Sequence, residues 1–491
     1  MIRIQNVSFR YAACETDALH DINLHIHKGE FVVLLGNSGC GKTSITRLIN
    51  RLVPEFFDGD LRGKVIVNGI NTAEQSIQDL VGMVGSVFQD PRSQFFTTDT
   101  TAEIAFSCEN IGLPREELRF RIEKAANNLK ITKLLDRSIF KLSSGEKQAV
   151  AVASVYALSP KILVLDEPSA NLDAAATIHL MNILHDLKKQ GYTIIVSEHR
   201  IHYLREIADR AVLIENGRIV KELSGKEFKG MSNESANDMG LRSIHLTKVS
   251  PSRISVLQKN EGLRLSKVSF RYEKENEPLK DISFCADKGS IVGIIGNNGV
   301  GKSTLLEIIC GLKKIKSGKI FLNGAPVSAK ERIKRSYLVM QDSDYQLFTE
   351  SVEKELYPGI KSDSRLPEKG NKLLERMGLA ELAARHPASL SGGQKQRLCI
   401  AVSCMKGADI ICLDEPTSGL DYSSMNSVSA LLHELADEDK TVLLTSHDYE
   451  FLITTCTHIC HLKDGAIKQF FDVNGQSVHK IYNILNQKED N

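Results

Sequence analysis

The chain has 491 residues, 42% hydrophobic and 25% charged, with 34 glycines and 12 prolines, and this composition excludes a collagen-like or disordered chain. Its 62 basic and 61 acidic residues leave a formal net charge of +1, so charge alone gives no reason to expect nucleic acid or an acidic membrane as the main partner. No window approaches the ~18 uninterrupted apolar residues of a membrane span, and residues 1–6 show strand-like alternation instead of a signal peptide. We therefore expect an intracellular chain that does not itself cross a bilayer.

Short apolar runs alternate with helical patterns along both halves of the chain. The buried strands are expected at residues 31–35, 162–165, 194–196, 291–295, 410–413 and 442–444. Four apolar residues of the first half share one face of a helix, namely Leu118, Ile122, Ala125 and Leu129. That helix lies in a stretch with few strand signals, which predicts a helical subdomain. Buried strands separated by helices predict an α/β fold with parallel sheets covered on both faces.

The two halves carry the same motifs in the same order. Residues 7–11 (VSFRY) return as residues 268–272, and residues 165–168 (LDEP) return as residues 413–416. The offset shrinks from 261 to 248 residues along the chain, as small deletions in the second copy would cause. We therefore expect two copies of one domain. The expected parts are domain 1 at 1–228, a polar linker with little structure of its own at 229–260, and domain 2 at 261–491.

Each copy contains a glycine-rich loop of the form G-x-x-x-x-G-K-[ST], which follows an expected strand and opens an expected helix. In such a loop, backbone N–H groups surround a phosphate, the lysine reaches the β- and γ-phosphates, and the Ser or Thr hydroxyl ligates Mg²⁺. Thr43 and Ser303 are the expected metal ligands of this type. The residues expected at the phosphates are Gly36, Asn37, Ser38, Gly39, Cys40, Gly41, Lys42, Thr43 and Ser44, and Gly296, Asn297, Asn298, Gly299, Val300, Gly301, Lys302, Ser303 and Thr304.

An apolar strand ends in two acids in each copy. Asp166 and Asp414 close the strands, at the sheet edge beside the phosphate loop, where each is expected to orient Mg²⁺ through water. Glu167 and Glu415 follow directly, and such a carboxylate can polarise the attacking water. The sequence therefore predicts two sites for nucleotide hydrolysis.

The remaining motifs resemble those of the ATP-binding-cassette (ABC) ATPases, and the resemblance covers nearly the whole chain outside the linker and the tail. Residues 390–397 (LSGGQKQR) look like the complete family signature, whereas residues 142–148 (LSSGEKQ) depart from it at Ser144 and Glu146. The resemblance implies two tandem P-loop NTPase domains. Each would be a RecA-like, mostly parallel sheet with an antiparallel β part and a helical subdomain.

The resemblance also assigns roles to single residues. Gln89 and Gln341 match the Q-loop glutamine, a further ligand of Mg²⁺, and residues 169–173 and 417–421 look like the D-loop. The switch histidine is matched by His199 and His447, and the aromatic residue that stacks on adenine by Tyr11 and Tyr272. The signature residues expected at the γ-phosphate are Ser143, Gly145, Ser391, Gly393 and Gln394.

In this family, two cassettes meet head to tail, and each ATP lies between the phosphate loop of one and the signature of the other. Because both cassettes lie in one chain, we expect an intramolecular pair instead of an obligate homodimer. The site built on Lys42 would face the complete signature, and the site on Lys302 the altered one. Since Ser144 adds a side chain where backbone must approach phosphate, we hypothesise that the Lys42 site hydrolyses ATP faster. Equal activity of the two sites is the alternative.

Three classes of ABC ATPase compete for the function of the chain. The DNA-repair and chromosome class is excluded, because the spans from Thr43 to Ser143 and from Ser303 to Ser391 leave no room for its long insertions. A tandem-cassette translation factor acting on ribosomes stays an alternative, although segment 229–260 lacks the long charged linker of that class. No nucleic acid partner is expected.

The third class is the transporter ATPase. Residues 89–96 and 341–348 look like the Q-loop extension of energy-coupling factor (ECF) importer ATPases, with departures at Arg92 and Ser343. The resemblance implies an ATP hydrolase at the cytoplasmic face of the membrane that energises import of a vitamin or transition metal. Its partners would be a transmembrane coupling subunit and a substrate-binding membrane subunit. A tandem sugar-importer ATPase is the alternative within transport.

Four aromatic residues of these two stretches are candidate anchors for the coupling subunit: Phe95, Phe96, Tyr345 and Phe348. Ordinary core packing is the alternative interpretation, and the exposure of the side chains distinguishes the two.

Overall fold

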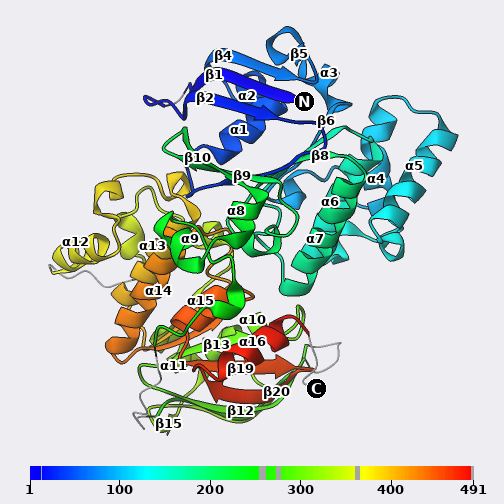
Figure 1. Cartoon of the computed structure of the whole chain (residues 1–491). Coiled ribbons are helices and arrows are strands. Elements are labelled where there is room, and N and C mark those ends of the chain that lie inside the picture. The colour runs from blue at the N-terminus through cyan, green and yellow to red at the C-terminus, as the bar shows by residue number, and fades with distance from the viewer. Residues whose placement is uncertain (13, 254–260, 273–277, 360–364, 488–491) are drawn as a thin grey trace. The chain divides into compact units, whose positions relative to one another are not determined.

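The computed structural model describes all residues except 13, 254–260, 273–277, 360–364 and 488–491. The described residues form two compact units, Met1–His245 and Leu246–Asn491 (Figure 1). Each unit contains one four-stranded antiparallel sheet and one six-stranded, mostly parallel sheet. The prediction of two tandem α/β domains is confirmed.

The first unit has its two sheets in the strand orders β2-β1-β4-β5 and β10-β9-β3-β8-β7-β6. The antiparallel sheet consists of β1 Ile2–Tyr11, β2 Leu19–Ile26, β4 Gly59–Val67 and β5 Ile70–Asn71. The larger sheet consists of β3 Phe31–Leu35, β6 Val84–Val87, β7 Ile162–Asp166, β8 Thr193–Ser197, β9 Arg210–Glu215 and β10 Arg218–Ser224. All its neighbouring strands are parallel except β9 and β10.

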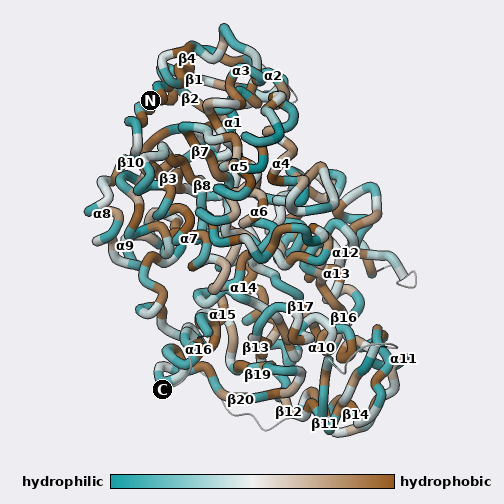
Figure 2. The backbone as a smooth tube through the Cα atoms, turned by 90° about the vertical axis from the view of Figure 1, so that its right-hand side faces the viewer, coloured by the Kyte–Doolittle hydropathy of each residue, from teal (hydrophilic) through white to brown (hydrophobic). Residues whose placement is uncertain are grey.

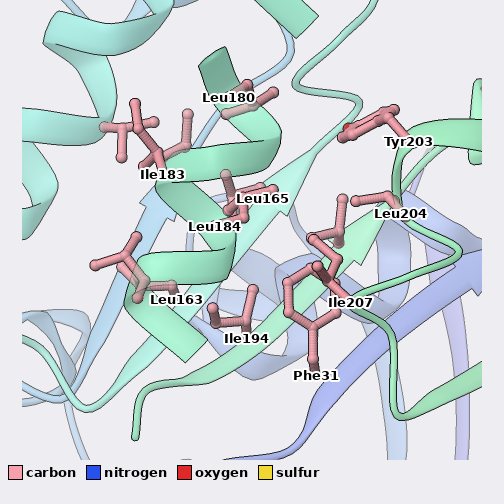
Figure 3. Close-up of a cluster of buried hydrophobic side chains, with 14 of the residues drawn as sticks. Phe31, Leu163, Leu165, Leu180, Ile183, Leu184, Ile194, Tyr203, Leu204 and Ile207 are labelled. Carbon is pink, nitrogen blue, oxygen red and sulfur yellow. The ribbon is translucent and has the colours of Figure 1, made fainter. Parts of the chain in front are cut away.

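The central strands β3, β7 and β8 are apolar on both faces because helices or the second sheet cover both sides. On one face, side chains of β7 and β8 meet those of helix α7 Ala174–Lys189 (Figure 3). On the other face, β3 and β7 share a core with the antiparallel sheet and with helix α1 Lys42–Ile49. The hydrophobic residues accordingly follow the strands of the sheet (Figure 2).

The predicted helical subdomain of the first unit is present. It consists of α4 Thr100–Asn110, α5 Arg115–Asn128 and α6 Ser144–Ala157, which pack against one another (Figure 1). Ile122 and Ala125 of α5 are buried, as the helical periodicity predicts. The short helices of the unit are α2 Leu52–Glu55, α3 Ile77–Val81, α8 Gly225–Gly230 and α9 Asn233–Asp238.

The second unit repeats this plan, with strand orders β12-β11-β14-β15 and β16-β17-β18-β13-β19-β20. Its strands are β11 Glu261–Phe270, β12 Leu279–Asp287, β13 Ile291–Ile295, β14 Ser317–Leu322, β15 Ala325–Pro326, β16 Ser336–Val339, β17 Ile410–Asp414, β18 Thr441–Thr445, β19 His458–Lys463 and β20 Ala466–Asp472. Its helices are α10 Lys302–Ile309, α11 Ala329–Arg335, α12 Leu366–Arg376, α13 Gly392–Met405, α14 Tyr422–Asp437, α15 Tyr449–Thr455 and α16 Ser477–Leu485. None of the helices in the described ranges combines the length and apolar character of a membrane span.

The predicted linker at residues 229–260 is wrong in its first part. It contains the end of α8 and all of α9, and the first unit extends through His245. The physical reason is that Phe228, Ala236 and Ile244 are fully buried in the core of that unit, although polar residues separate them in the sequence. The last part of the predicted linker, residues 254–260, lies outside the described residues.

Candidate nucleotide sites

The first phosphate loop connects the buried end of β3 to the start of α1. Lys42 is buried, and its Nζ donates to the carbonyl oxygens of Gly36 (2.8 Å) and Asn37 (3.0 Å), so the ammonium group bridges the loop. Gly36 has φ 139°, and a Cβ there would lie 2.2 Å from the carbonyl oxygen of Ile214. Only glycine therefore fits this position of the loop. The Lys42 ammonium group and the N-terminus of α1 lie together at the loop, and both favour binding of an anion.

The second phosphate loop has the same geometry. Lys302 Nζ donates to the carbonyl oxygens of Gly296 (2.8 Å) and Asn297 (3.2 Å), and Gly296 has φ 153°. His447 adds a contact, because its Nε2 lies 3.0 Å from Lys302 Nζ and 3.0 Å from Asn298 Oδ1. Each unit therefore has a lysine-bridged loop of the shape that the predicted phosphate binding requires.

The pairing register of β7 and β8 places Asp166 directly beside Ser197. The hydroxyl groups of Ser197 and Thr43 both donate to Asp166 Oδ1, the latter over 3.2 Å. Burial raises the pKa of the Asp166 carboxyl, and the neighbouring Glu167 adds to this, while the two hydroxyl groups partly offset it. A carboxylate and a hydroxyl at the edge of the phosphate loop are the oxygen donors that Mg²⁺ prefers, so these residues fit the predicted metal site.

Three predicted site residues of the first unit converge on one another. Glu167 has φ 43°, and its backbone N–H donates to the carbonyl oxygen of Ser197 over 2.9 Å, which turns the residue out of the end of β7. Gln89 Nε2 donates to Glu167 Oε2 over 2.7 Å, and His199 Nε2 lies 3.1 Å from Glu167 Oε1. A carboxylate with an amide and an imidazole at its two oxygens can orient a water molecule and accept its proton.

The second unit repeats this cluster with one difference. Thr445 Oγ1 donates to Asp414 Oδ1 over 2.5 Å, and Glu415, with φ 47°, lies 3.5 Å from His447 Nε2. Gln341 is exposed at the end of β16, and within the described residues its side chain forms no hydrogen bond with Glu415. Among the described residues, the glutamine is therefore bonded to the predicted catalytic carboxylate in the first unit and not in the second.

The two signatures cap helices by the same hydrogen bonds. Ser143 caps α6 through the N–H of Glu146, whose carboxylate accepts the N–H of Ser143 in return; Ser391 and Gln394 do the same for α13. The Gln-to-Glu departure thus keeps the cap but adds a charge. Although burial opposes ionisation, the hydrogen bonds from Ser143 and from Arg137 hold the pKa of Glu146 below its usual value.

The glycines of the two signatures differ in how closely other atoms approach them. A Cβ on Gly145 would lie 2.5 Å from Ala176 Cβ, and one on Gly393 would lie 3.2 Å from Ser424 Cβ, so both glycines allow close approach of the following helix. A Cβ on Gly392 meets no atom within 4 Å, and its counterpart Ser144 is exposed. The Ser144 side chain is therefore accommodated without a steric clash in its own unit.

The two tyrosines expected at adenine lie against the helix that begins at each phosphate loop. Tyr11 OH lies 3.0 Å from Ser44 Oγ, and Tyr272 OH lies 3.2 Å from Thr304 Oγ1. Each ring also contacts the preceding phenylalanine edge to face, Phe9 in the first unit. The aromatic ring and the phosphate loop are thus fixed relative to each other within each unit.

Sequence reasoning missed several residues of these sites. Ser197 and Thr445 donate to the aspartates predicted to bind the metal, and buried Glu198 accepts hydrogen bonds from the N–H groups of Ser169 and His199. Ser197 and Thr445 stand at the same offset in the two copies as His199 and His447, and that repetition was the signal available in the sequence.

The chain is similar to known proteins in sequence and in fold. The protein family described as ABC transporter matches residues 19–170 and 279–418. A Treponema denticola protein named as an ABC transporter ATP-binding protein is 46% identical over 474 residues, covering 95% of this chain and 96% of that protein. A Bacillus subtilis protein named as an HMP/thiamine import ATP-binding protein, YkoD, is 32% identical and covers 95% of this chain and 90% of its own length. A structure of ribosome-bound archaeal Pelota and ABCE1 matches with a TM-score of 0.70 at 20% identity, over 98% of this chain and 80% of that one, and this likeness shows the fold alone.

Proposed function

The chain belongs to the ABC transporter family as an ATP-binding, ATP-hydrolysing subunit with two cassettes, and from this premise we propose that it energises an ECF-type importer of a micronutrient. The solute would be a vitamin or a transition metal, carried by separate membrane subunits at the cytoplasmic face of the membrane. Two features support the proposal: the Q-loop extensions at residues 89–96 and 341–348, and the likeness to a protein named for HMP/thiamine import.

One observation carries the link from hydrolysis to transport. In the first unit, Gln89 bonds the catalytic carboxylate of Glu167, and only a few residues later Phe96 is 74% exposed. In the second unit, Phe348 is 78% exposed at the corresponding place. We call residues 89–96 and 341–348 the docking segments, and propose that they receive short helices of a transmembrane coupling subunit. Phe95 is the exception among the four predicted anchors, because it packs against the core of the first unit.

Within each site, the side chains divide the reaction among them. Lys42 and Lys302 leave their loop carbonyls to bind the β- and γ-phosphates of ATP, and Tyr11 and Tyr272 stack on adenine. Glu167 and Glu415 orient the attacking water and accept its proton, while His199 and His447 hold the transferred phosphoryl group. The residues that would hold Mg²⁺ are Thr43, Gln89 and Asp166, and Ser303, Gln341 and Asp414. When bound, Mg²⁺ supplies positive charge that stabilises the phosphate oxygens.

We propose further that ATP completes each site only when the two cassettes pair head to tail within one chain. The signature helices α6 and α13 would then direct their N-terminal N–H groups at the γ-phosphate of the other cassette. The Lys42 site would receive the complete signature at Ser391–Gln394, and the Lys302 site the signature that carries Ser144 and Glu146. We expect the first of these sites to be the faster one.

The experiment that tests the transport proposal compares affinity-purified chain with a variant that carries Phe96→Ala and Phe348→Ala. The unmodified chain should recover polytopic membrane proteins from detergent-solubilised membranes, and the double variant should lose them several-fold while keeping ATP binding. Phe120→Ala, at an aromatic residue of α5 that is also exposed, is the matched control and should change neither. Recovery of ribosomes instead of membrane proteins would refute the proposal. Deletion cells that fail to grow only when one vitamin or metal is scarce would identify the solute.

A further inference from the structure

A buried carboxylate holds the end of the first docking segment. Glu103, on α4, is 2% exposed, and its Oε2 accepts the backbone N–H of Phe96 (3.0 Å) and of Thr97 (2.9 Å). The hydroxyl group of Thr97 lies 3.0 Å from the same oxygen. Three donors converging on one buried carboxylate oxygen fix the backbone direction from which the exposed Phe96 side chain projects.

The second unit repeats this arrangement on different local structure. Glu355, 3% exposed, accepts the N–H groups of Phe348 (3.1 Å) and Thr349 (2.8 Å) and the hydroxyl of Thr349 (2.7 Å). Glu103 belongs to an eleven-residue α-helix, whereas Glu355 belongs to a three-residue 3-10 turn, Lys354–Leu356. The same three hydrogen bonds form in both units although the secondary structure that carries the glutamate differs. The local secondary structure therefore does not account for these hydrogen bonds.

The other end of each docking segment is held as well. Phe88 and Met340 immediately precede the segments: the N–H of Phe88 donates to Gln94 Oε1 over 3.3 Å, and the N–H of Met340 donates to Gln346 Oε1 over 2.8 Å. Each segment is therefore a short stretch held at its start by its own glutamine and at its end by the buried glutamate. Its exposed aromatic residue lies at the end that the buried glutamate holds.

We propose that Glu103 and Glu355 are positioning residues that hold Phe96 and Phe348 ready for the membrane subunit. This inference rests on the proposed docking function. Removing either carboxylate leaves two backbone N–H groups without their acceptor, so the segment rearranges to reach water and the phenylalanine loses its fixed direction. The phosphate loop and the acids of the catalytic cluster are on other elements, and the bonds from Phe88 and Met340 keep the Gln89 and Gln341 ends of the segments in place, so ATP binding and basal hydrolysis persist.

The local part of the test needs no partner. Glu103→Ala in the full chain should speed hydrogen exchange at the Phe96 and Thr97 amides by at least about tenfold, since each loses a bond to a charged acceptor. Glu103→Gln, which keeps the shape of the side chain, guards against misfolding and should give a smaller increase. Thr97→Val removes only the hydroxyl donor and is the matched control with little change. Unchanged exchange in both Glu103 variants would overturn the inference, whatever the partner.

The second part measures recovery of the membrane subunits that co-purify with the unmodified chain. Glu103→Ala combined with Glu355→Ala should lower this recovery as much as Phe96→Ala combined with Phe348→Ala, with basal ATP hydrolysis retained. All four substitutions together should be no worse than the phenylalanine pair, because the glutamates act through those residues. Loss of recovery in the phenylalanine pair alone would overturn the inference and leave the proposed function standing. Full recovery in both pairs would overturn the inference and the docking proposal together.

Discussion

Exchanging one residue between the two signatures tests whether they touch nucleotide. Gly392→Ser gives the second signature the departure of the first. A Cβ at Gly392 meets no atom within 4 Å, and serine exceeds glycine in helix propensity by only about 0.5 kcal/mol, so the free energy of unfolding should change by no more than that. The reverse change, Ser144→Gly, removes an exposed side chain and should also leave the fold intact.

The effect on hydrolysis should be much larger. If the serine side chain displaces one N–H bond to a phosphate oxygen, worth about 1.5–3 kcal/mol, kcat/KM falls about 10- to 150-fold. The assay follows ATP hydrolysis in a Glu415→Gln background, which leaves the Lys42 site as the active one. Ser144→Gly in a Glu167→Gln background should raise the rate of the Lys302 site. Unchanged kcat/KM in the Gly392→Ser protein, with an unchanged melting temperature, would refute the assignment of this signature to ATP.

Three further predictions concern single side chains. Glu167→Gln should reduce ATP hydrolysis of the full chain more than Glu415→Gln, and equal losses, or a larger loss from the second variant, would contradict the asymmetry of the sites. Asp166→Asn should abolish hydrolysis yet raise the melting temperature, because burial raises the pKa of this carboxyl in the folded state. The penalty for ionising Asp166 is absent below its unfolded pKa, 3.8, and grows as pH rises through its higher folded pKa, so the gain in melting temperature should be smaller at about pH 3 than at pH 7; a constant gain would be the contrary result. A maleimide should block ATP binding through Cys40, whose sulfur lies 3.9 Å from Lys42 Nζ, with ATP protecting and Cys40→Ala insensitive; labelled Cys40 with intact ATP binding would disprove it.

Several features of the protein were determined by short stretches of sequence. The strands β3, β7, β8, β13, β17 and β18 lie where the uninterrupted apolar runs predict them, because a strand buried on both faces needs apolar residues at every position. The phosphate loops were equally predictable, since Gly36 and Gly296 adopt φ values that favour glycine and leave a spaced pattern in the sequence. The duplicated plan followed from the repeated order of these motifs.

Other features depend on which distant segments meet, and only the tertiary structure decided them. Ser197 lies beside Asp166 because of the register between β7 and β8, which no local pattern specifies. Phe95 packs against the core while its neighbour Phe96 is exposed, and buried Glu103 of a different element accepts the N–H that joins them. Residues 229–245 are polar enough to predict a linker, yet their few apolar side chains are buried in the core of the first unit. Burial and strand register are properties of the assembled unit, so they leave no complete signal in any one stretch of the chain.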